Sequence, residues 1–356
     1  MIFVAFVVYF FCAARPVPPE TVLQIRWLSS LESDEPVFAD GFRQTGGAEV
    51  AGAFPFMLGG HFGYFDSEGR FAVNQMKEGN LSLSQTKWAQ YGAEPDSVEV
   101  LDSSGALIET IENPHGYPMF LDGRTFILGS EQNSIAETDG AGGLLWEHEF
   151  AAPLTCADAA SGFVLTGSID GVVEILDFAG RRIFSFEPGG SQYSVILGCA
   201  FSRDGSRFAI ISGIGEQRFL LLERFGAAGG EYKVVYHEFL GAGFRRPAHV
   251  AFIDQDRKVV FEREGGVGIY NIGGRGSLSI DLEGEIAALD SSGDEGRLFV
   301  IVKTDAGRNK LVGINLPGKI FMRAPFVSDD VFMGRAGSRL FLGGGTTLAS
   351  FELEKK

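Results

Sequence analysis

A short motif recurs seven times along this chain: an acidic or amide residue, followed three positions later by glycine, between apolar runs. The pairs are Asp66–Gly69, Asp102–Gly105, Asp139–Gly142, Asp177–Gly180, Glu223–Gly226, Asn271–Gly274 and Asn315–Gly318. Asp and Asn can hydrogen-bond their own backbone in a turn, and glycine accepts the positive φ that tight hairpins need. We therefore expect each motif to close a β-hairpin, and we interpret Asp177 as a turn residue rather than a catalytic acid.

The spacing of the motifs predicts the architecture. Successive motifs are separated by roughly 36 to 48 residues, the period of propeller blades. A second turn lies upstream in several repeats, as at Asp204–Gly205 within 198–213, so each repeat contains four strands. The apolar period is two almost throughout, which favours strands over helices. Four-stranded antiparallel sheets that repeat radially form an all-β β-propeller.

The two ends of the repeat array complement each other. The last repeat ends with an apolar run at 347–353 and has no fourth strand, whereas the run at 21–28 has no hairpin partner of its own. We expect these two runs to pair, which would close the ring and protect its edges. This count gives eight blades in a single domain over 21–356, with seven as the alternative because 29–60 is the least defined stretch.

Two stretches resemble known propeller families. FSRDGSRFAI, residues 201–210, resembles the turn between the first two strands of WD-repeat and related bacterial propellers. GGLLWEHEF, residues 142–150, resembles the Gly-x-x-Trp element of quinoprotein-like (PQQ-type) repeats. The resemblance implies mostly binding scaffolds, some of them exported and involved in assembling outer-membrane proteins. It also implies a minority that carry a cofactor and oxidise alcohols, and fold alone does not choose between these roles.

Charge and the N-terminus bear on partners and location. A formal charge of −16 argues against a nucleic-acid partner, which needs a clustered basic face. Residues 1–14 are almost wholly apolar but short for a membrane span, so we interpret them as a signal peptide or an N-terminal anchor, with Cys12 as a lipid-attachment alternative. Residues 15–20 would be a linker. We expect an exported protein, either periplasmic or membrane-anchored, whose membrane contact is made only by this segment.

The remaining cysteines, Cys156 and Cys199, each lie just ahead of a predicted strand, at similar positions of neighbouring repeats. Neither belongs to a paired motif, so we expect free thiols, with a disulfide as the alternative. The cysteines and the five histidines show no ligand spacing typical of zinc. We predict no metal and no cofactor.

Loops between the second and third strands, and between one repeat and the next, should share one mouth of the central channel. The polar residues that we expect at this mouth, as a partner-binding surface, are His115, Tyr117, Asp170, Arg245, Arg246, His249, Asp305 and Arg308. No catalytic motif unites them. For the two histidines we favour a hydrogen bond to a neighbouring blade over a ligand-binding role, whereas the adjacent arginines could meet an acidic partner.

These observations predict a non-enzymatic scaffold that binds other envelope or extracellular proteins through the loops at one channel mouth. The alternative is a periplasmic small-molecule-binding protein or a cofactor-dependent enzyme, perhaps using a quinone or a metal. That alternative requires His115, His249 and Arg245 to converge on one ligand-sized hole.

Overall fold

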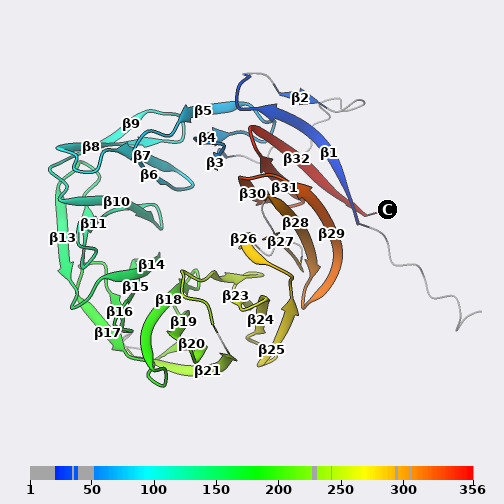
Figure 1. Cartoon of the computed structure of the whole chain (residues 1–356). Helices are drawn as coiled ribbons and strands as arrows, with labels where there is room; N and C mark the ends of the chain where they lie inside the picture. Colours follow the sequence, from blue (N-terminus) through cyan, green and yellow to red (C-terminus); the bar gives the residue numbers. More distant parts are fainter. Residues whose placement is uncertain are drawn as a thin grey trace, which may run out of the picture.

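The computed structural model describes residues 21–33, 36–38, 52–226, 231–241, 243–292, 296–304 and 307–355. The regular elements of these ranges are strands, grouped into eight sheets that are arranged radially about a central axis (Figure 1). The expected signal or anchor at 1–14, the linker at 15–20 and Asp305 lie outside the described residues. Within the described ranges, no helix is long and apolar enough to cross a membrane.

The eight sheets are the blades of a β-propeller, which confirms the prediction of eight rather than seven. Blade 1 consists of β3 (Phe54–Leu58), β4 (His61–Phe65) and β5 (Phe71–Met76), and blade 2 of β6 (Asn80–Leu83), β7 (Lys87–Tyr91), β8 (Ser97–Asp102) and β9 (Leu107–Glu112). Blade 3 consists of β10 (Gly116–Leu121), β11 (Arg124–Gly129), β12 (Ser134–Thr138) and β13 (Leu144–Glu149). Blade 4 consists of β14 (Leu154–Ala160), β15 (Phe163–Ser168), β16 (Val173–Leu176) and β17 (Arg182–Phe186).

Blades 5 to 8 follow in the same order around the ring. Blade 5 consists of β18 (Tyr193–Phe201), β19 (Arg207–Ile214), β20 (Gln217–Phe225) and β21 (Glu231–Gly241), and blade 6 of β22 (Val250–Ile253), β23 (Lys258–Arg263), β24 (Gly266–Asn271) and β25 (Gly276–Asp281). Blade 7 consists of β26 (Glu285–Leu289), β27 (Arg297–Lys303), β28 (Arg308–Asn315) and β29 (Lys319–Val327). Blade 8 consists of β30 (Val331–Ala336), β31 (Arg339–Gly344), β32 (Thr347–Lys355), β1 (Thr21–Ser30) and β2 (Val37–Phe38).

Blades 1 to 7 are antiparallel meanders whose first strand in the chain lies innermost and whose last lies at the rim, as β10 to β13 illustrate (Figure 1). In blade 8, β30 lies innermost and β1 and β2 lie at the rim. The antiparallel order places two kinds of connection on one face of the ring. These are the turns between the second and third strands of a blade and the connections from one blade to the next. We call this face the mouth face; the remaining turns lie on the opposite face.

The ring closes through its termini. Strand β1 pairs antiparallel with β32 along its whole length, from Thr21 opposite Lys355 to Ser30 opposite Thr347, and the two strands lie side by side in Figure 1. Strand β2 then pairs with the outer edge of β1. The predicted pairing of 21–28 with 347–353 is therefore confirmed, and the last blade is built from both ends of the chain.

The repeated Asp-x-x-Gly motif forms the turn between the last two strands of a blade. In blade 4, Asp177 Oδ1 accepts the backbone N–H groups of Ala179 and Arg181 at 2.9 and 3.0 Å, and Gly180 adopts φ 72°. Asp66, Asp102 and Asp139 accept the corresponding pair of N–H groups in blades 1, 2 and 3. The structural interpretation of Asp177 is confirmed.

One member of the series was assigned wrongly from the sequence. Glu223 was expected to occupy the turn position before Gly226, but β20 continues to Phe225 and Glu223 lies within the strand. It forms an ion pair with Arg207 of β19 at 2.7 Å and is paired with Lys233 of β21. The physical reason is that the pairing of β20 with β21 continues past Glu223 to Phe225 opposite Glu231, so Glu223 lies inside the ladder.

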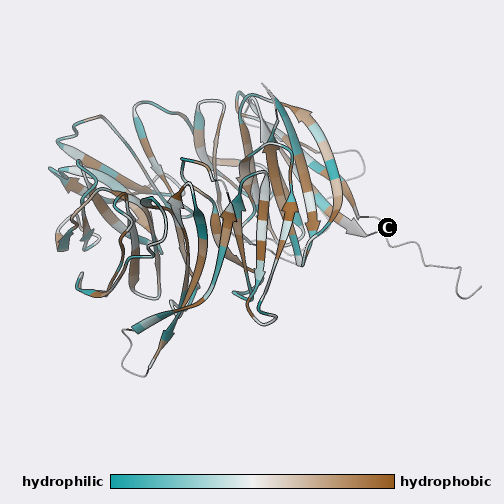
Figure 2. Ribbon diagram, turned by 60° about the horizontal axis from the view of Figure 1, so that its bottom comes forward, coloured by the Kyte–Doolittle hydropathy of each residue, from teal (hydrophilic) through white to brown (hydrophobic). Residues whose placement is uncertain are grey.

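The hydrophobic core lies between blades rather than at the centre of the ring. Apolar side chains from adjoining sheets interlock around the ring, and apolar segments recur along the strands in Figure 2. Phe56 and Phe65 of blade 1 are 1 % and 0 % exposed and pack against Trp27 and Phe341 of blade 8. These phenylalanines therefore pack between blades, as expected of propeller sheets, which bury both faces.

Candidate functional site

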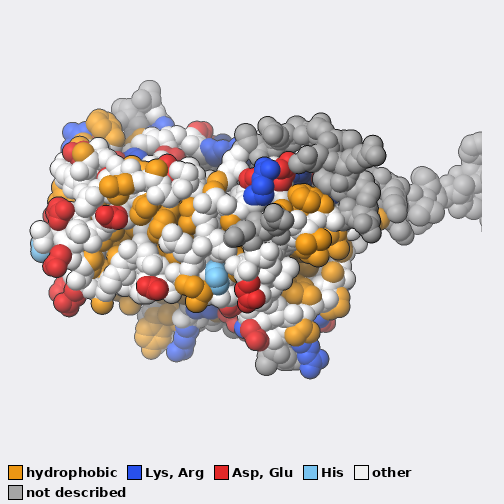
Figure 3. All heavy atoms as spheres, turned by 90° about the horizontal axis from the view of Figure 1, so that it is seen from above, with side chains coloured by type: hydrophobic (Ala, Val, Ile, Leu, Met, Phe, Trp, Pro, Cys, Tyr) orange, Lys and Arg blue, Asp and Glu red, His pale blue; other side chains and the backbone are white. Residues whose placement is uncertain are grey.

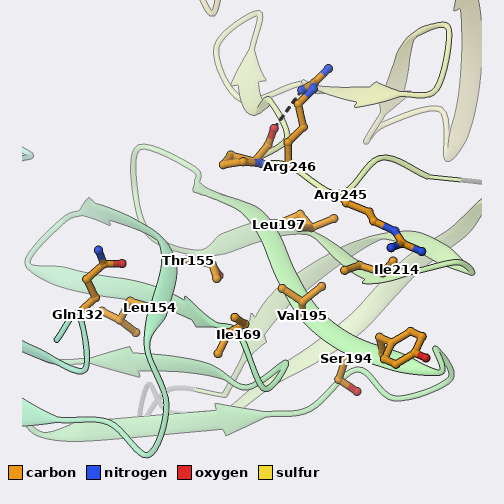
Figure 4. Close-up of a pocket in the computed structure, with 12 residues that line it drawn as sticks. Gln132, Leu154, Thr155, Ile169, Ser194, Val195, Leu197, Ile214, Arg245 and Arg246 are labelled. Atoms are coloured by element: carbon orange, nitrogen blue, oxygen red, sulfur yellow. Dashed lines mark hydrogen bonds between the residues drawn. The ribbon is translucent and has the colours of Figure 1, made fainter.

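A cavity of about 680 Å³ opens on the mouth face above blades 4 and 5 (Figure 4). Its wall combines the first residues of the innermost strands β14 and β18 with turns from blades 3, 4 and 5 and the connection between blades 5 and 6. The residues that line it are Gln132, Leu154, Thr155, Ile169, Tyr193, Ser194, Val195, Leu197, Ile214, Arg245, Arg246 and Pro247. Its volume is that of a ligand pocket, and most of its side chains are apolar.

Two large apolar side chains of this cavity remain in contact with solvent. Ile169, in the turn between β15 and β16, is 55 % exposed, and Tyr193, at the start of β18, is 59 % exposed. Val195 and Leu197 of β18 also line the cavity and are buried. The cavity therefore presents an apolar surface that the ring itself does not cover.

Arg245 and Arg246 have different environments although they are adjacent. Arg246 Nη2 and Nη1 bind the Glu262 carboxylate at 2.6 and 3.1 Å, and Arg246 Nε binds Glu285 Oε1 at 2.8 Å. The hydrogen bond to Glu262 raises the pKa of Arg246 above its ordinary value. Arg245 is exposed, forms no ion pair among the described residues, and extends toward Ile214 in Figure 4. The charge of Arg246 is therefore balanced by two carboxylates, whereas the charge of Arg245 is balanced by none among the described residues and can pair with a ligand.

Glu262 fixes the loop that carries both arginines. This carboxylate, on β23, is only 2 % exposed and also accepts the backbone N–H of His249 at 3.1 Å. The backbone N–H of Glu262 in turn donates to the His249 carbonyl at 2.8 Å. A buried carboxylate is tolerated when it is paired and hydrogen-bonded, so this network holds residues 246–249 in one conformation.

The structure brings together only two of the residues predicted at the mouth, Arg245 and Arg246. His249 is exposed and follows the cavity-lining Pro247 by two positions, with its backbone bound to Glu262 as described above. His115 is exposed at the start of blade 3, where its carbonyl accepts the Ser130 N–H at 3.2 Å. Neither histidine lines the cavity, so the three residues that the enzyme alternative requires do not converge there.

Three further predicted residues, Tyr117, Asp170 and Arg308, lie elsewhere on the mouth face. Tyr117 of β10 packs against Tyr91 of blade 2, with ring centroids 6.0 Å apart. Asp170 accepts a hydrogen bond from the Ser168 hydroxyl and lines a separate cavity of about 260 Å³. Arg308 begins β28 and lines a third cavity, of about 680 Å³, beside blade 7. Asp305 lies outside the described residues.

The sequence reasoning missed the apolar residues that give the cavity its character. Ile169 stands in the polar turn Ser168-Ile169-Asp170-Gly171, and Tyr193 follows the polar run Gly-Gly-Ser-Gln. A large apolar residue inside a polar connection is a usable signal, because a solvated turn gains nothing from it. The prediction concentrated on charged residues and so overlooked this signal.

The two described cysteines lie on the innermost strands of neighbouring blades, β14 and β18. Cys156 and Cys199 are free thiols, as expected. Over the described ranges, no three His, Cys, Asp or Glu side chains gather in a way that could hold a metal ion. Acidic side chains are scattered over the side of the ring drawn in Figure 3 rather than gathered in one patch.

Comparisons with known proteins agree on the architecture. A family model described as beta-propeller protein matches residues 1–356. A protein of Treponema pallidum (strain Nichols), itself described as uncharacterized, is 27 % identical over 284 residues, which covers 80 % of this chain and 74 % of that protein.

Solved structures show the same fold at low identity. BamB from Moraxella catarrhalis has a TM-score of 0.60 at 13 % identity and covers 93 % of this chain and 100 % of its own. The computationally designed Ika8 protein has a TM-score of 0.61 at 17 % identity, covering 86 % and 94 %. Sqt1 from Saccharomyces cerevisiae has a TM-score of 0.58 at 12 % identity, covering 86 % and 97 %. By its family match over the whole length, this chain belongs to the beta-propeller proteins.

Proposed function

We propose that this protein is a non-enzymatic scaffold that binds a segment of a partner protein in the cavity above blades 4 and 5. The observation that carries the proposal is the pairing of exposed apolar side chains, Ile169 and Tyr193, with the available charge of Arg245 in one cavity. Exposed apolar surface rimmed by polar groups is typical of protein-binding sites. Tyr and Arg are also the side chains most enriched at the energetic centres of interfaces.

The chemistry of the cavity selects the kind of segment. An apolar side chain of the partner would cover Ile169 and Tyr193, and a carboxylate beside it would pair with the Arg245 guanidinium, which matches carboxylate geometry. Arg246 cannot compete for that carboxylate, because Glu262 and Glu285 already occupy its donors. We therefore infer that the partner segment combines an apolar residue with an acidic residue or a chain terminus.

A rigid ring suits this role. The cavity is assembled from three blades and an inter-blade connection, and each blade is held by its neighbours through the core described above. A preformed site loses little conformational entropy when it binds a partner. The apolar segment at residues 1–14 supports export of the scaffold, so we place its partners among envelope or extracellular proteins.

The proposal can be tested with peptides selected from a random-peptide phage library on the full chain. Dissociation constants of the enriched peptides would be measured by fluorescence anisotropy for the wild type, Ile169→Ser, Arg245→Gln and Arg308→Gln. Arg308 is the matched control, because it is an exposed arginine of the mouth face in a different cavity.

We expect Arg245→Gln to weaken binding by about tenfold or more, since one charge-assisted hydrogen bond contributes about 1.5 kcal/mol or more. Ile169→Ser should have an effect of similar size, since burial of a large aliphatic side chain contributes about 1.5 to 3 kcal/mol. Arg308→Gln should leave the affinity unchanged. If no selected peptide depends on Ile169, the cavity is not the binding site and the proposal fails. If peptide binding depends on Ile169 but is equally strong to Arg245→Gln, the cavity is the binding site, and the inference that a partner carboxylate pairs with Arg245 is wrong.

A further inference from the structure

The innermost strands of blades 4 and 5 are tied together by two side-chain hydrogen bonds. Near the mouth face, the Thr155 hydroxyl of β14 donates a hydrogen bond to the Ile196 carbonyl of β18. Further from the mouth face, Asp158 Oδ2 accepts the backbone N–H of Phe201 at 2.7 Å, and Asp158 Oδ1 accepts the N–H of Ala159 at 2.9 Å. These contacts fix the register of two strands that belong to different sheets.

The two free thiols lie between these hydrogen bonds. Cys156 precedes Asp158 by two positions and Cys199 precedes Phe201 by two, so each cysteine shares a side of its strand with the residue of the lower contact. Both cysteines pack in the hydrophobic cluster shared by blades 4 and 5, and they are 43 positions apart in the chain, the same offset as Asp158 and Phe201. Gly167 makes room for this arrangement, because a Cβ atom there would lie 2.8 Å from Cys156 Sγ.

We propose that Cys156 and Cys199 form a disulfide between blades 4 and 5 when the folded protein meets a disulfide oxidant such as oxidised glutathione. The Cys156 thiolate attacks the oxidant, forms a mixed disulfide and releases one thiol. Cys199 then loses its proton and attacks the Cys156 sulfur, which forms the protein disulfide and releases the second thiol. Two protein thiols are oxidised and one oxidant disulfide is reduced to two thiols.

The order of these steps follows from the surroundings of the sulfurs. The hydrogen bond with Cys156, together with burial, raises the pKa of the Cys199 thiol well above its ordinary value. A protonated thiol is a poor nucleophile, so Cys199 is the resolving residue rather than the attacking one. Once the mixed disulfide has formed, the fixed strands hold Cys199 beside its target, and proximity compensates for its low thiolate fraction.

The cross-link would join the strands that form the floor of the cavity. Thr155, which lines the cavity, immediately precedes Cys156, and Leu197 precedes Cys199 by two positions on the other strand. Oxidation would therefore make the hydrogen-bonded contact between β14 and β18 covalent. This modification is independent of the proposed binding function and can be detected without any partner.

The test uses the reduced full chain, incubated with oxidised glutathione at mildly alkaline pH, then denatured, alkylated and digested for mass spectrometry. We expect one linked pair of peptides, containing Cys156 and Cys199 and lighter by two hydrogens than their sum, and a raised melting temperature that dithiothreitol reverses. The Cys12→Ser variant should give the same cross-link, and Cys156→Ala should leave Cys199 without an intramolecular partner. Recovery of both residues as free thiols, or of a glutathione adduct on each, would overturn the proposal.

Discussion

Gly180 of blade 4 lies directly against the indole of Trp146 of blade 3, so closely that a Cβ atom built on the glycine would be 2.4 Å from the ring carbons. The same relationship recurs at the closure of the ring, where a Cβ atom on Gly69 would be 2.7 Å from the Trp27 ring. The glycine of the turn motif therefore serves two purposes in these blades. It adopts positive φ, and it leaves room for a tryptophan of the preceding blade.

Replacement of Gly180 by alanine should destabilise the fold without altering the cavity. We expect a loss of about 1 to 2 kcal/mol from the left-handed backbone and about 1 to 3 kcal/mol from overpacking against Trp146. Gly123→Ala is the matched control, because Gly123 has the same φ of 72° and a Cβ atom there meets nothing within 4 Å. Urea unfolding should give the larger loss at Gly180. Equal losses at both positions would show that the indole contact contributes nothing.

The account of ring closure predicts a large effect at Trp27. This side chain is 2 % exposed, stacks on Phe341 with centroids 6.0 Å apart, and donates from Nε1 to the Ser67 carbonyl at 2.9 Å. Trp27→Ala should reduce the free energy of unfolding by about 3 to 5 kcal/mol. Phe38→Ala, at the exposed outer edge of the same sheet, should change it by only about 0.5 kcal/mol. A Trp27→Ala variant as stable as Phe38→Ala would contradict closure by β1.

The sequence allowed the fold to be predicted because the turn motif is local. Asp66, Asp102, Asp139 and Asp177 form their turns from hydrogen bonds within five residues, so the pattern is visible without tertiary structure. The role of Trp27 was not visible in this way. Only ring closure brings Trp27 onto the turn of blade 1, and the Gly-x-x-Trp element is recognisable in the sequence of blade 3 alone.

The site was harder to predict than the fold. The adjacent arginines were identified, but their division of roles depends on Glu262 and Glu285, which lie 16 and 39 positions beyond Arg246 on other strands. The apolar wall of the cavity joins residues of blades 4 and 5 and of the connection to blade 6, so no local pattern reveals it. His115 lies in a connection between two blades, as Arg245 does, so the sequence predicts both at the same channel mouth. In the structure His115 lies at the start of blade 3 and does not line the cavity.

The loop that carries Arg245 and Arg246 should be stabilised more by the buried carboxylate of Glu262 than by the exposed carboxylate of Glu285. Glu262→Gln leaves Arg246 facing a neutral amide at a buried position, so we expect a loss of about 1 to 3 kcal/mol in the free energy of unfolding. Glu285 has a side chain that is 61 % exposed, and Glu285→Gln should cost about 0.5 kcal/mol or less. Chemical denaturation compares the two. A greater loss at Glu285 would mean that the loop is anchored from blade 7 instead.

One turn should respond to acid in a defined way. Burial alone would raise the pKa of Asp204, but the Ser206 backbone N–H and the hydroxyls of Ser202 and Ser206 outweigh it and lower the pKa to about 2. Because the folded pKa lies below the unfolded value, this carboxylate stabilises the fold above about pH 4 and the contribution is lost as the pH falls toward 2. Asp204→Asn keeps the accepting oxygen and removes the ionisation.

The difference in unfolding free energy between wild type and Asp204→Asn should therefore shrink between pH 5 and pH 3, measured in urea. A difference that stays constant over this interval would show that the charge of Asp204 does not contribute.

The central claim, that the cavity on the mouth face is a protein-binding site, is tested most directly by site-specific photo-cross-linking in the cells that produce the protein. The probe is p-benzoylphenylalanine at Tyr193, 59 % exposed in the cavity, with the same probe at Phe178, 74 % exposed on the opposite face, as the control. The account predicts a discrete protein adduct from position 193, none from position 178, and loss of the adduct when Arg245→Glu is introduced. Adducts that form equally from both positions, or no adduct from position 193, would contradict it.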